Sequence, residues 1–278
     1  MAEKIGFVDF YLSEWHAENY PVWMRELTKD YDVAYGWAET DISPVSGKTT
    51  DDWCREFGVE KCETLDGLCK ASDVIVILAP SDPEKHLEYA KKVLPYGKPT
   101  YIDKTFAPNL ASAKEIFALA EKHGTPLFST SALRYASELD ALEGVTHIST
   151  TGGGSNLPEY IVHQTEMVVK RIGIGAESIR AEKSGDEVVF FITYPDGRCA
   201  KMTYAKAYPF TAYMENGEKA VFKTAASEFF KALMADMLRF FEDGKPSFDT
   251  AETLEIMAIR EAALCAAENP GTAVSIAK

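Results

Sequence analysis

The sequence predicts an α/β protein in which a doubly wound parallel sheet precedes an α+β domain with an open, largely antiparallel sheet. Two patterns along the 278 residues predict this fold class. Up to about residue 130, short apolar segments alternate with amphipathic helical patterns, which is typical of βαβ units. From about residue 145, strand-like segments follow one another across short glycine-containing turns, which is typical of hairpins. We therefore expect two domains, residues 1–130 and residues 131–278.

The first domain is expected to be of the Rossmann type. Its strands are expected at residues 4–10, 31–37, 74–79, 100–103 and 126–129. Its helices are expected at residues 13–27, 51–57, 83–94 and 109–123, with Ser13 as the cap of the first. The segment Val74–Ala79 contains no polar residue, so both of its faces are expected to be buried, as they are in parallel sheets.

The second domain mixes strands with helices. Strands are expected at residues 145–151, 178–183, 188–194 and 198–204, and helices at 159–172, 227–242 and 249–268. Asp249 and Glu252 have the spacing of a capping box at the start of the last helix. Both faces of Val188–Ile192 are apolar, so one face is expected to pack on helices and the other on a partner subunit. The sequence therefore predicts a homodimer or homotetramer formed through this sheet.

The composition excludes several classes of function. The chain has 43 acidic and 29 basic residues and a net charge of −14, with no basic cluster, so neither nucleic acid nor an anionic membrane is expected as a partner. No apolar segment approaches the roughly 18 residues of a membrane span, and no signal-peptide pattern is present. The five cysteines are scattered without a C-x-x-C pair, which predicts reduced thiols, no metal site and a cytoplasmic protein.

The carboxyl ends of the expected parallel strands locate a ligand site, because open parallel sheets bind ligands beyond these ends. The residues that follow the strands include Asp9, Glu39, Pro80, Asp103 and Ser131. These positions locate the expected site without the use of any motif.

Several segments, in this order and spacing, resemble the Gfo/Idh/MocA oxidoreductases, the family of glucose–fructose oxidoreductase and inositol dehydrogenase. The matching segments are Asp73–Pro80 with His86 downstream, Gly97–Thr105, Glu159–Glu166, and the tail from Pro246 to Val274. The resemblance covers nearly the whole chain. It implies an N-terminal Rossmann domain that binds NAD or NADP and a C-terminal domain that serves substrate binding and oligomerisation.

The resemblance also implies catalytic residues. The family's Glu-Lys-Pro motif falls on Asp103-Lys104-Thr105, so the family's lysine corresponds to Lys104, whose ammonium would hydrogen-bond a substrate hydroxyl and the nicotinamide ribose. The family's histidine corresponds to His163, which would accept the hydroxyl proton as hydride leaves the same carbon. The alternatives are a surface lysine and a satisfied buried histidine.

Three further residues are candidates near His163 or the substrate. Glu166 lies on the same helical face as His163, where the family often has aspartate, and it could orient His163, bind substrate or be a surface carboxylate. Arg134 follows the last Rossmann strand and could reach a polyhydroxyl or carboxylate ligand or form an interdomain salt bridge. Tyr160, in the same matched segment as His163, is assigned to substrate binding.

The cofactor positions depart from the family's pattern. Gly6 matches the first glycine of the dinucleotide fingerprint, but Val8 and Tyr11 stand where the next two glycines are expected. Their side chains would fill the space that a diphosphate needs, and Asp9 adds a negative charge. Glu39 or Asp41 would accept hydrogen bonds from ribose hydroxyls, and no arginine lies nearby to hold a 2′-phosphate, which favours NAD over NADP. The cofactor-binding candidates are Gly6, Val8, Asp9, Glu39, Pro80 and Asp103.

These patterns leave different functions open. One is an NAD(P)-dependent oxidoreductase that transfers hydride between nicotinamide and a secondary alcohol or ketone of a sugar or polyol, with Lys104 holding the oxygen and His163 relaying the proton. Another is a non-catalytic ligand-binding or regulatory protein that has the same fold but has lost dinucleotide binding, as the residues at Val8, Asp9 and Tyr11 indicate. A third is elimination or glycoside cleavage through a transient redox step with a tightly held cofactor.

Overall fold

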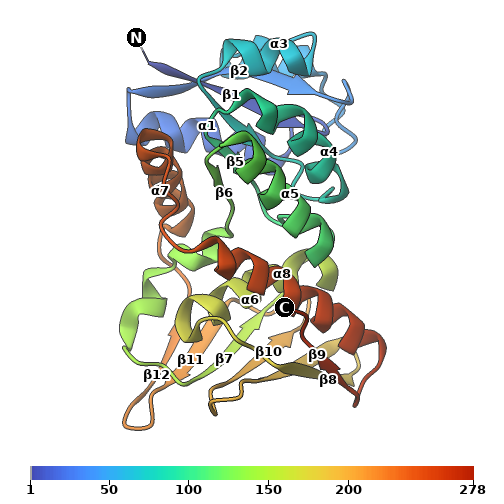
Figure 1. The fold of residues 1–278 in the computed structure, drawn as a ribbon, viewed down its shortest axis with the longest axis vertical. Helices are drawn as coiled ribbons and strands as arrows, with labels where there is room; N and C mark the ends of the chain where they lie inside the picture. Colours follow the sequence, from blue (N-terminus) through green and yellow to red (C-terminus); the bar gives the residue numbers. More distant parts are fainter. Residues whose placement is uncertain (1) are drawn as a thin grey trace. The chain divides into compact units, whose positions relative to one another are not determined.

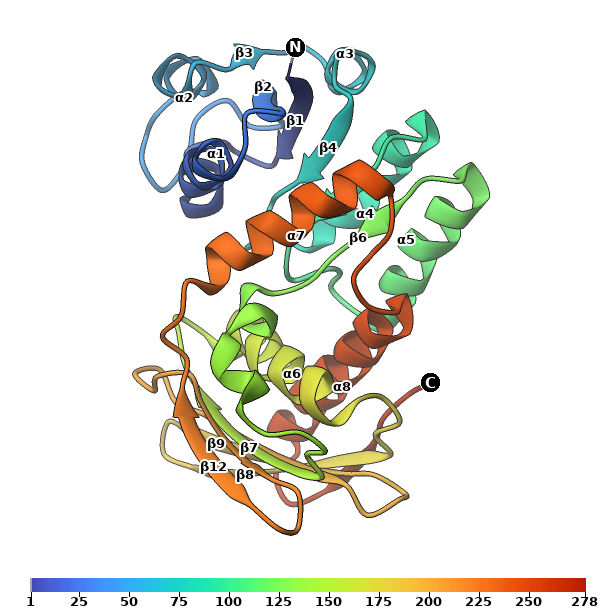
Figure 2. The ribbon, with the colours of Figure 1, turned by 90° about the vertical axis from the view of Figure 1, so that its left-hand side faces the viewer.

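The computed structural model describes residues 2–278, which form two compact units. Unit 1 contains residues up to Thr130 together with residues 231–247, and unit 2 contains residues 131–230 and 248–278. The segment 231–247, assigned to the second domain from sequence, thus belongs to unit 1. It contains most of helix α7 (Phe229–Asp243), whose Phe240 packs on Phe128 and whose Phe241 packs on Tyr31. Figure 2 shows α7 running beside β6 within unit 1.

Unit 1 contains a six-stranded sheet in which every pair of neighbouring strands is parallel. The strand order is β3-β2-β1-β4-β5-β6, which is the doubly wound Rossmann order (Figure 1). The strands are β1 (Glu3–Asp9), β2 (Tyr31–Ala38), β3 (Glu60–Lys61), β4 (Val74–Ile77), β5 (Thr100–Ile102) and β6 (Leu127–Phe128). The predicted parallel sheet is confirmed, although the sequence pattern missed β3.

Most helices of unit 1 begin at side-chain caps, whereas the helix Glu84–Val93 begins after Pro83 without one. Asn109 accepts a hydrogen bond from Ser112 N at the start of α5, and Gly124 ends that helix with φ 63°. The helices are α1 (Trp15–Leu27), α2 (Thr50–Phe57), α3 (Leu65–Ala71), α4 (Glu84–Val93) and α5 (Leu110–His123). The seven-residue helix α3 was not expected.

The centre of the unit 1 sheet is fully covered. All four residues of β4 are buried, as their uninterrupted apolar sequence predicts, and each such side chain contributes about 1.5–3 kcal/mol when removed from water. On the neighbouring strand, Gly6 is required because a Cβ there would overlap the side chains of Leu68 and Ser72, at the end of α3. Gly6 therefore lies inside β1 and serves close packing rather than a turn.

Unit 2 contains a seven-stranded sheet of order β12-β11-β7-β10-β9-β8-β13. Only β7 and β10 run parallel, so the predicted open, largely antiparallel sheet is confirmed. The strands are β7 (His147–Gly152), β8 (Ser178–Ser184), β9 (Glu187–Thr193), β10 (Cys199–Tyr204), β11 (Thr211–Glu215), β12 (Ala220–Thr224) and β13 (Ala273–Ser275). The sequence pattern missed β11, β12 and β13.

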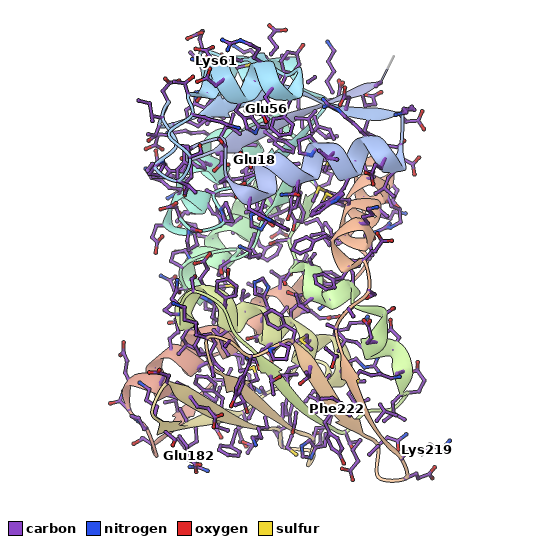
Figure 3. All side chains as sticks on the ribbon, turned by 180° about the vertical axis from the view of Figure 1, so that it is seen from behind. Glu18, Glu56, Lys61, Glu182, Lys219 and Phe222 are labelled. Atoms are coloured by element: carbon purple, nitrogen blue, oxygen red, sulfur yellow. The ribbon has the colours of Figure 1, made fainter. Side chains whose placement is uncertain are left out.

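Two helices, α6 (Leu157–Ile172) and α8 (Thr250–Glu268), cover one face of this sheet (Figure 2). Val188, Phe190 and Ile192 of β9 are buried on that side, whereas the alternate residues are only half-buried. On β12, Phe222 is 63% exposed (Figure 3). The predicted role of this other face in oligomerisation stays a prediction.

None of the helices described for residues 2–278 combines the length and the apolar character that a membrane crossing requires. The five cysteines are free, and burial raises the pKa of the Cys54 and Cys69 thiols to about 12. These two thiols are therefore poor nucleophiles at neutral pH.

Candidate functional site

The strand order of unit 1 reverses between β1 and β4, and Asp9 lies at this point. Asp9 is the last residue of β1 and is 1% exposed. Its Oδ1 accepts hydrogen bonds from Phe10 N at 2.7 Å and from Ala79 N at 3.0 Å, which ties the end of β1 to the chain beyond β4. Its Oδ2 has no hydrogen-bond partner among the described residues. The crevice where open parallel sheets bind ligands thus contains a buried carboxyl group.

The surroundings of Asp9 favour its neutral form. Burial raises the pKa of Asp9 well above its usual value, and the charge of Glu14 raises it further. Hydrogen bonds from the backbone of Ala79, Phe10 and Tyr11 lower the pKa by a smaller amount. A second anion next to Asp9 is therefore unfavourable.

Glu14 is the N-cap of α1, a role that the sequence pattern assigned to Ser13. Its Oε1 accepts from Ala17 N at 2.5 Å, and its Oε2 accepts from His16 N at 2.9 Å and lies 2.9 Å from His16 Nδ1. Burial alone would raise the pKa of Glu14, but the hydrogen bonds from His16 and Ala17 outweigh it and lower the pKa. Glu14 is thus a buried negative charge at the positive end of a helix dipole.

His16 connects this charge to the end of β5. His16 Nε2 lies 3.7 Å from Asp103 Oδ2, and Asp103 is fully buried directly after β5. Tyr20 OH donates to Asp103 Oδ1 at 3.2 Å, and burial together with the Asp103 charge raises the pKa of Tyr20. Asp103 Oδ2 accepts no hydrogen bond from the described residues. The same edge of the sheet therefore holds three carboxyl groups, those of Asp9, Glu14 and Asp103.

The start of α1 does not fit a dinucleotide diphosphate in this conformation. A diphosphate needs unpaired N–H groups at the helix start and a turn of small residues before it. Glu14 already accepts from the N–H groups of His16 and Ala17, and the turn at residues 10–14 contains no glycine. Gly6 and Val8, expected in this turn, lie inside β1.

Of the two other predicted cofactor residues, Glu39 is exposed but interacts with other side chains of the chain, and Pro80 is buried. Glu39 follows β2, where its Oε1 lies 2.6 Å from Lys85 Nζ and its Oε2 accepts from Tyr89 OH at 2.9 Å. Pro80 is buried beyond Ala79. Lys85, 46 residues from Glu39 in sequence, was missed from the sequence pattern. Because a cation does stand beside Glu39, the absence of a nearby arginine no longer favours NAD over NADP.

The two residues after Asp103, Lys104 and Thr105, lack the hydrogen-bond partners that Glu14 and Glu39 have. Lys104 is 9% exposed, and its ammonium makes no hydrogen bond or ion pair within residues 2–278. Thr105, which replaces the family's proline, is 1% exposed, and its Oγ1 has no hydrogen-bond partner among the described residues. Leaving a buried polar group unsatisfied costs about 1–3 kcal/mol. A bound ligand that supplied oxygen atoms here would remove this cost.

His86, from the matched segment after β4, has a structural position. It is fully buried, with Nδ1 3.1 Å from Phe106 O and Nε2 2.5 Å from Leu78 O. Burial lowers the pKa of His86. The ring thus joins the chain beyond β4 to the chain beyond β5.

His163 lies on α6 in unit 2, where Ser131 fixes its ring. Ser131 Oγ lies 2.6 Å from His163 Nδ1, and the rings of Tyr160 and Phe210 each lie 5.6 Å from the imidazole in edge contacts. The sequence pattern assigned Tyr160 to substrate, and the structure places it against His163 and against Gly154. The sequence pattern placed Ser131 after the last strand of the Rossmann domain but gave it no further role. That position was the available signal that Ser131 lies at the site.

Glu166 holds the backbone of Ser131 in place. It is 2% exposed, so it is not a surface carboxylate; its Oε2 accepts from Ser131 N at 3.2 Å, and its Oε1 lies 2.5 Å from Arg134 Nε. Arg134 Nη2 also contacts Glu252 Oε2 at 2.6 Å, so Glu252 pairs with Arg134 instead of closing a capping box with Asp249. Burial alone would lower the pKa of Arg134, but Glu166 and Glu252 outweigh it and raise the pKa.

The charge of Arg134 is therefore compensated within unit 2. The structure assigns Lys104 to unit 1 and His163, Glu166, Arg134 and Tyr160 to unit 2. Among residues 2–278, no group of three or more His, Cys, Asp or Glu side chains has an arrangement that could hold a metal ion.

Comparisons with known proteins agree with this architecture. The Gfo/Idh/MocA family model, described as an oxidoreductase family with an NAD-binding Rossmann fold, matches residues 36–131. A putative myo-inositol dehydrogenase from Sinorhizobium meliloti 1021 has a TM-score of 0.80, with 99% of this chain and all of that chain covered at 13% identity. Over residues 36–131 the chain is thus similar to the Gfo/Idh/MocA oxidoreductases.

Two other known proteins are similar to this chain over different lengths. A scyllo-inositol dehydrogenase from Lactobacillus casei, solved with NAD(H) and scyllo-inositol, has a TM-score of 0.80 at 12% identity, with both chains covered completely. At these identities the likeness concerns the fold. The uncharacterized oxidoreductase YhhX of Escherichia coli K12 is 42% identical over 60 residues, which span 22% of this chain and only 17% of that protein.

Proposed function

We propose that this protein is an oxidoreductase of the Gfo/Idh/MocA family that acts on a secondary alcohol, or the matching ketone, of a neutral sugar or polyol. The observation that carries the proposal is Lys104, a nearly buried ammonium group after β5 that no side chain of unit 1 neutralises. An unpaired positive charge in this position costs free energy, and a ligand that hydrogen-bonds to it reduces that cost. The family's own chemistry supplies the reaction class.

Lys104 would bind the oxygen atom of the substrate. As the hydroxyl loses its proton, negative charge develops on that oxygen, and an ammonium group held in a site of low polarity stabilises it. In the reverse direction the same hydrogen bond polarises the ketone. Thr105 Oγ1, also unsatisfied, is positioned in sequence to bind a neighbouring hydroxyl.

His163 would accept the hydroxyl proton. When Nδ1 carries the imidazole proton and donates it to Ser131 Oγ, the lone pair lies on Nε2, the atom that would take the proton. Glu166 is then a positioning residue, because it holds Ser131 N and thereby the hydroxyl that orients the ring.

The substrate class follows from the charge of the site and from a structural relative. Carboxyl groups of Asp9, Glu14 and Asp103 surround the edge of the unit 1 sheet, which disfavours phosphorylated or carboxylated substrates. The Lactobacillus casei relative was solved with scyllo-inositol, a neutral polyol. We therefore expect neutral polyols or sugars to bind better than their phosphate esters.

The test is a panel of inositols and aldoses, with NAD and with NADP, read by the absorbance of reduced nicotinamide. Turnover is expected with at least one neutral member and should fall about 10²–10³-fold in Lys104→Met. The matched control is Lys92→Met, because Lys92 is a surface lysine paired with Glu88. Full turnover in Lys104→Met, with its fold intact, would contradict the proposed role.

A second candidate function is a ligand-binding or regulatory protein that no longer uses a dinucleotide. Glu14 at the start of α1 and Glu39 after β2, both engaged by the chain itself, favour it. It predicts calorimetric binding of a polyol that depends on Lys104 but gives no redox change with either cofactor.

A further inference from the structure

We propose that Glu14 is an internal competitor for the diphosphate of a nicotinamide dinucleotide. Its carboxylate fills the anion-binding position at the start of α1, and a dinucleotide binds there only when Glu14 is displaced. The inference concerns the cofactor end of the proposed oxidoreductase site, and it rests on that proposal only for the identity of the competing ligand.

The hydrogen bonds of Glu14 are those that a bound phosphate oxygen would make. Two consecutive backbone N–H groups of α1, those of His16 and Ala17, donate to its two carboxylate oxygens at 2.9 and 2.5 Å. The side chain is 8% exposed, so the charge is enclosed rather than solvated. Since each N–H group has one hydrogen to donate, Glu14 and a phosphate cannot use them together.

The neighbouring charge adds to this competition. Asp9 ends β1 on the other side of the same turn, and its fully buried Oδ2 has no hydrogen-bond partner among the described residues. Burial, and after it the charge of Glu14, raises the pKa of Asp9 and favours the neutral acid. A diphosphate brought here beside Glu14 would place further negative charge next to a carboxyl group that already resists ionisation.

The likeness to the family changes at the same place. The family match begins at residue 36, within β2, so β1, the turn and α1 lie outside it. Glu39, the next group that a dinucleotide would need, is also engaged, by Lys85 and Tyr89. By contrast, Lys104 and Thr105 keep unsatisfied polar atoms. The carboxylates after β1 and β2 thus already have partners within the chain, whereas the polar atoms of Lys104 and Thr105 after β5 do not.

The test measures the affinity of the whole protein for NADH and for ADP-ribose. ADP-ribose carries the diphosphate but no redox-active ring, so its binding, followed by calorimetry, does not depend on activity. NADH binding is followed by quenching of tryptophan fluorescence, because Trp15 adjoins Glu14 and packs edge-on against Trp23, 5.6 Å away. In Glu14→Ala both ligands are expected to bind at least about tenfold more tightly than in the wild type, which is about 1.4 kcal/mol.

Two further variants keep the test decisive. Glu14→Gln retains a hydrogen-bond acceptor without the charge, so it should give a smaller gain, and it serves if Glu14→Ala does not fold. The matched control is Glu18→Ala, which removes a partly exposed carboxylate from the first turn of the same helix (Figure 3). Glu18→Ala should leave both affinities within about twofold of the wild type, because Glu18 does not use the N–H groups of His16 and Ala17.

The outcomes separate this inference from the proposed function. Unchanged or weaker binding in the Glu14 variants overturns it, as does an equal gain in Glu18→Ala or absence of binding in every variant. Binding in Glu14→Ala but not in the wild type supports the inference about Glu14. The same outcome would contradict the proposal that the wild type is an oxidoreductase that uses free dinucleotide. Polyol turnover by the wild type, lost in Lys104→Met, supports the proposed function whatever the Glu14 variants do.

Discussion

The carboxyl edge of the unit 1 sheet has two halves that treat polar groups in opposite ways. Around β1 and β2, Glu14 and Glu39 are matched by N–H, O–H and ammonium donors from the chain itself. Around β5, Lys104 and Thr105 are nearly buried with polar atoms that the described residues leave unsatisfied. A ligand must break existing interactions in the first half, whereas it completes missing ones in the second.

Unit 2 contains a second set of charged side chains that have partners within the chain. Arg134 is buried between Glu166 and Glu252 and stacks on Phe248, 3.7 Å from its ring centroid. These groups hold one another and Ser131 in place. Substitution of side chains that have partners within the chain should therefore change the stability of the fold. Substitution of side chains whose polar atoms lack partners should change ligand binding and turnover.

The largest expected effect on stability is that of Arg134→Met. The change leaves Glu166 buried without its cation, and breaking a buried ion pair from one side costs about 3–5 kcal/mol. The free energy of unfolding from urea titrations should fall by about that amount. Arg134→Lys should recover part of it, because it keeps the charge but not the two-sided geometry. A loss below about 1 kcal/mol in Arg134→Met would show that the network contributes little.

The next effect is the pH dependence introduced by Asp9. Its pKa is raised by burial, so its neutral form stabilises the fold fully below the unfolded-state pKa of about 4, and this contribution is lost as pH rises through the folded-state pKa. Asp9→Asn keeps an acceptor for Ala79 N and Phe10 N but does not titrate. Its stability relative to the wild type should therefore improve between pH 4 and pH 8. Each unit of pKa difference corresponds to about 1.4 kcal/mol. A pH-independent difference between the two proteins would mean that Asp9 is not held neutral.

The smallest effect is expected in the unsatisfied half. Thr105→Val removes a buried hydroxyl that has no partner, so the free energy of unfolding should stay the same or rise by up to about 1 kcal/mol. Polyol affinity should fall in the same variant. The matched control is Thr105→Ser, which keeps the hydroxyl group. Thr253→Val would not serve as a control, because Thr253 has interactions of its own. A clear loss of stability in Thr105→Val would erase the contrast between the two halves.

Local sequence patterns predicted the elements that local physics determines. The uninterrupted apolar run of β4 and the amphipathic pattern of α5 depend on residues close in sequence, and both elements appear as expected, with α5 beginning one residue after Asn109. The short strands β3 and β13 did not, because two or three residues carry no periodicity and pair only once their neighbours are in place. The side of the molecule on which α7 buries its apolar face is likewise set by tertiary packing.

The site was predicted in outline and missed in detail for a similar reason. Positions after strand ends could be read from the strands, which gave Asp9, Asp103 and Lys104. The end of β1 could not be fixed to the residue, so Gly6 and Val8 were placed in a turn that lies beyond them. Partners such as Lys85 for Glu39 come together only in the folded sheet, and no spacing rule announces them.

The position of α7 has a consequence for the order in which the protein can be made. Unit 1 takes its last helical segment, residues 231–247, from beyond most of unit 2. A ribosome that has released residue 130 has therefore delivered every strand of the first sheet but not the helix that covers Phe128 and Tyr31. A fragment ending at residue 130 would expose these rings, so an excised Rossmann domain needs residues 231–247 fused to it, and the first unit to begin folding is among the last to finish.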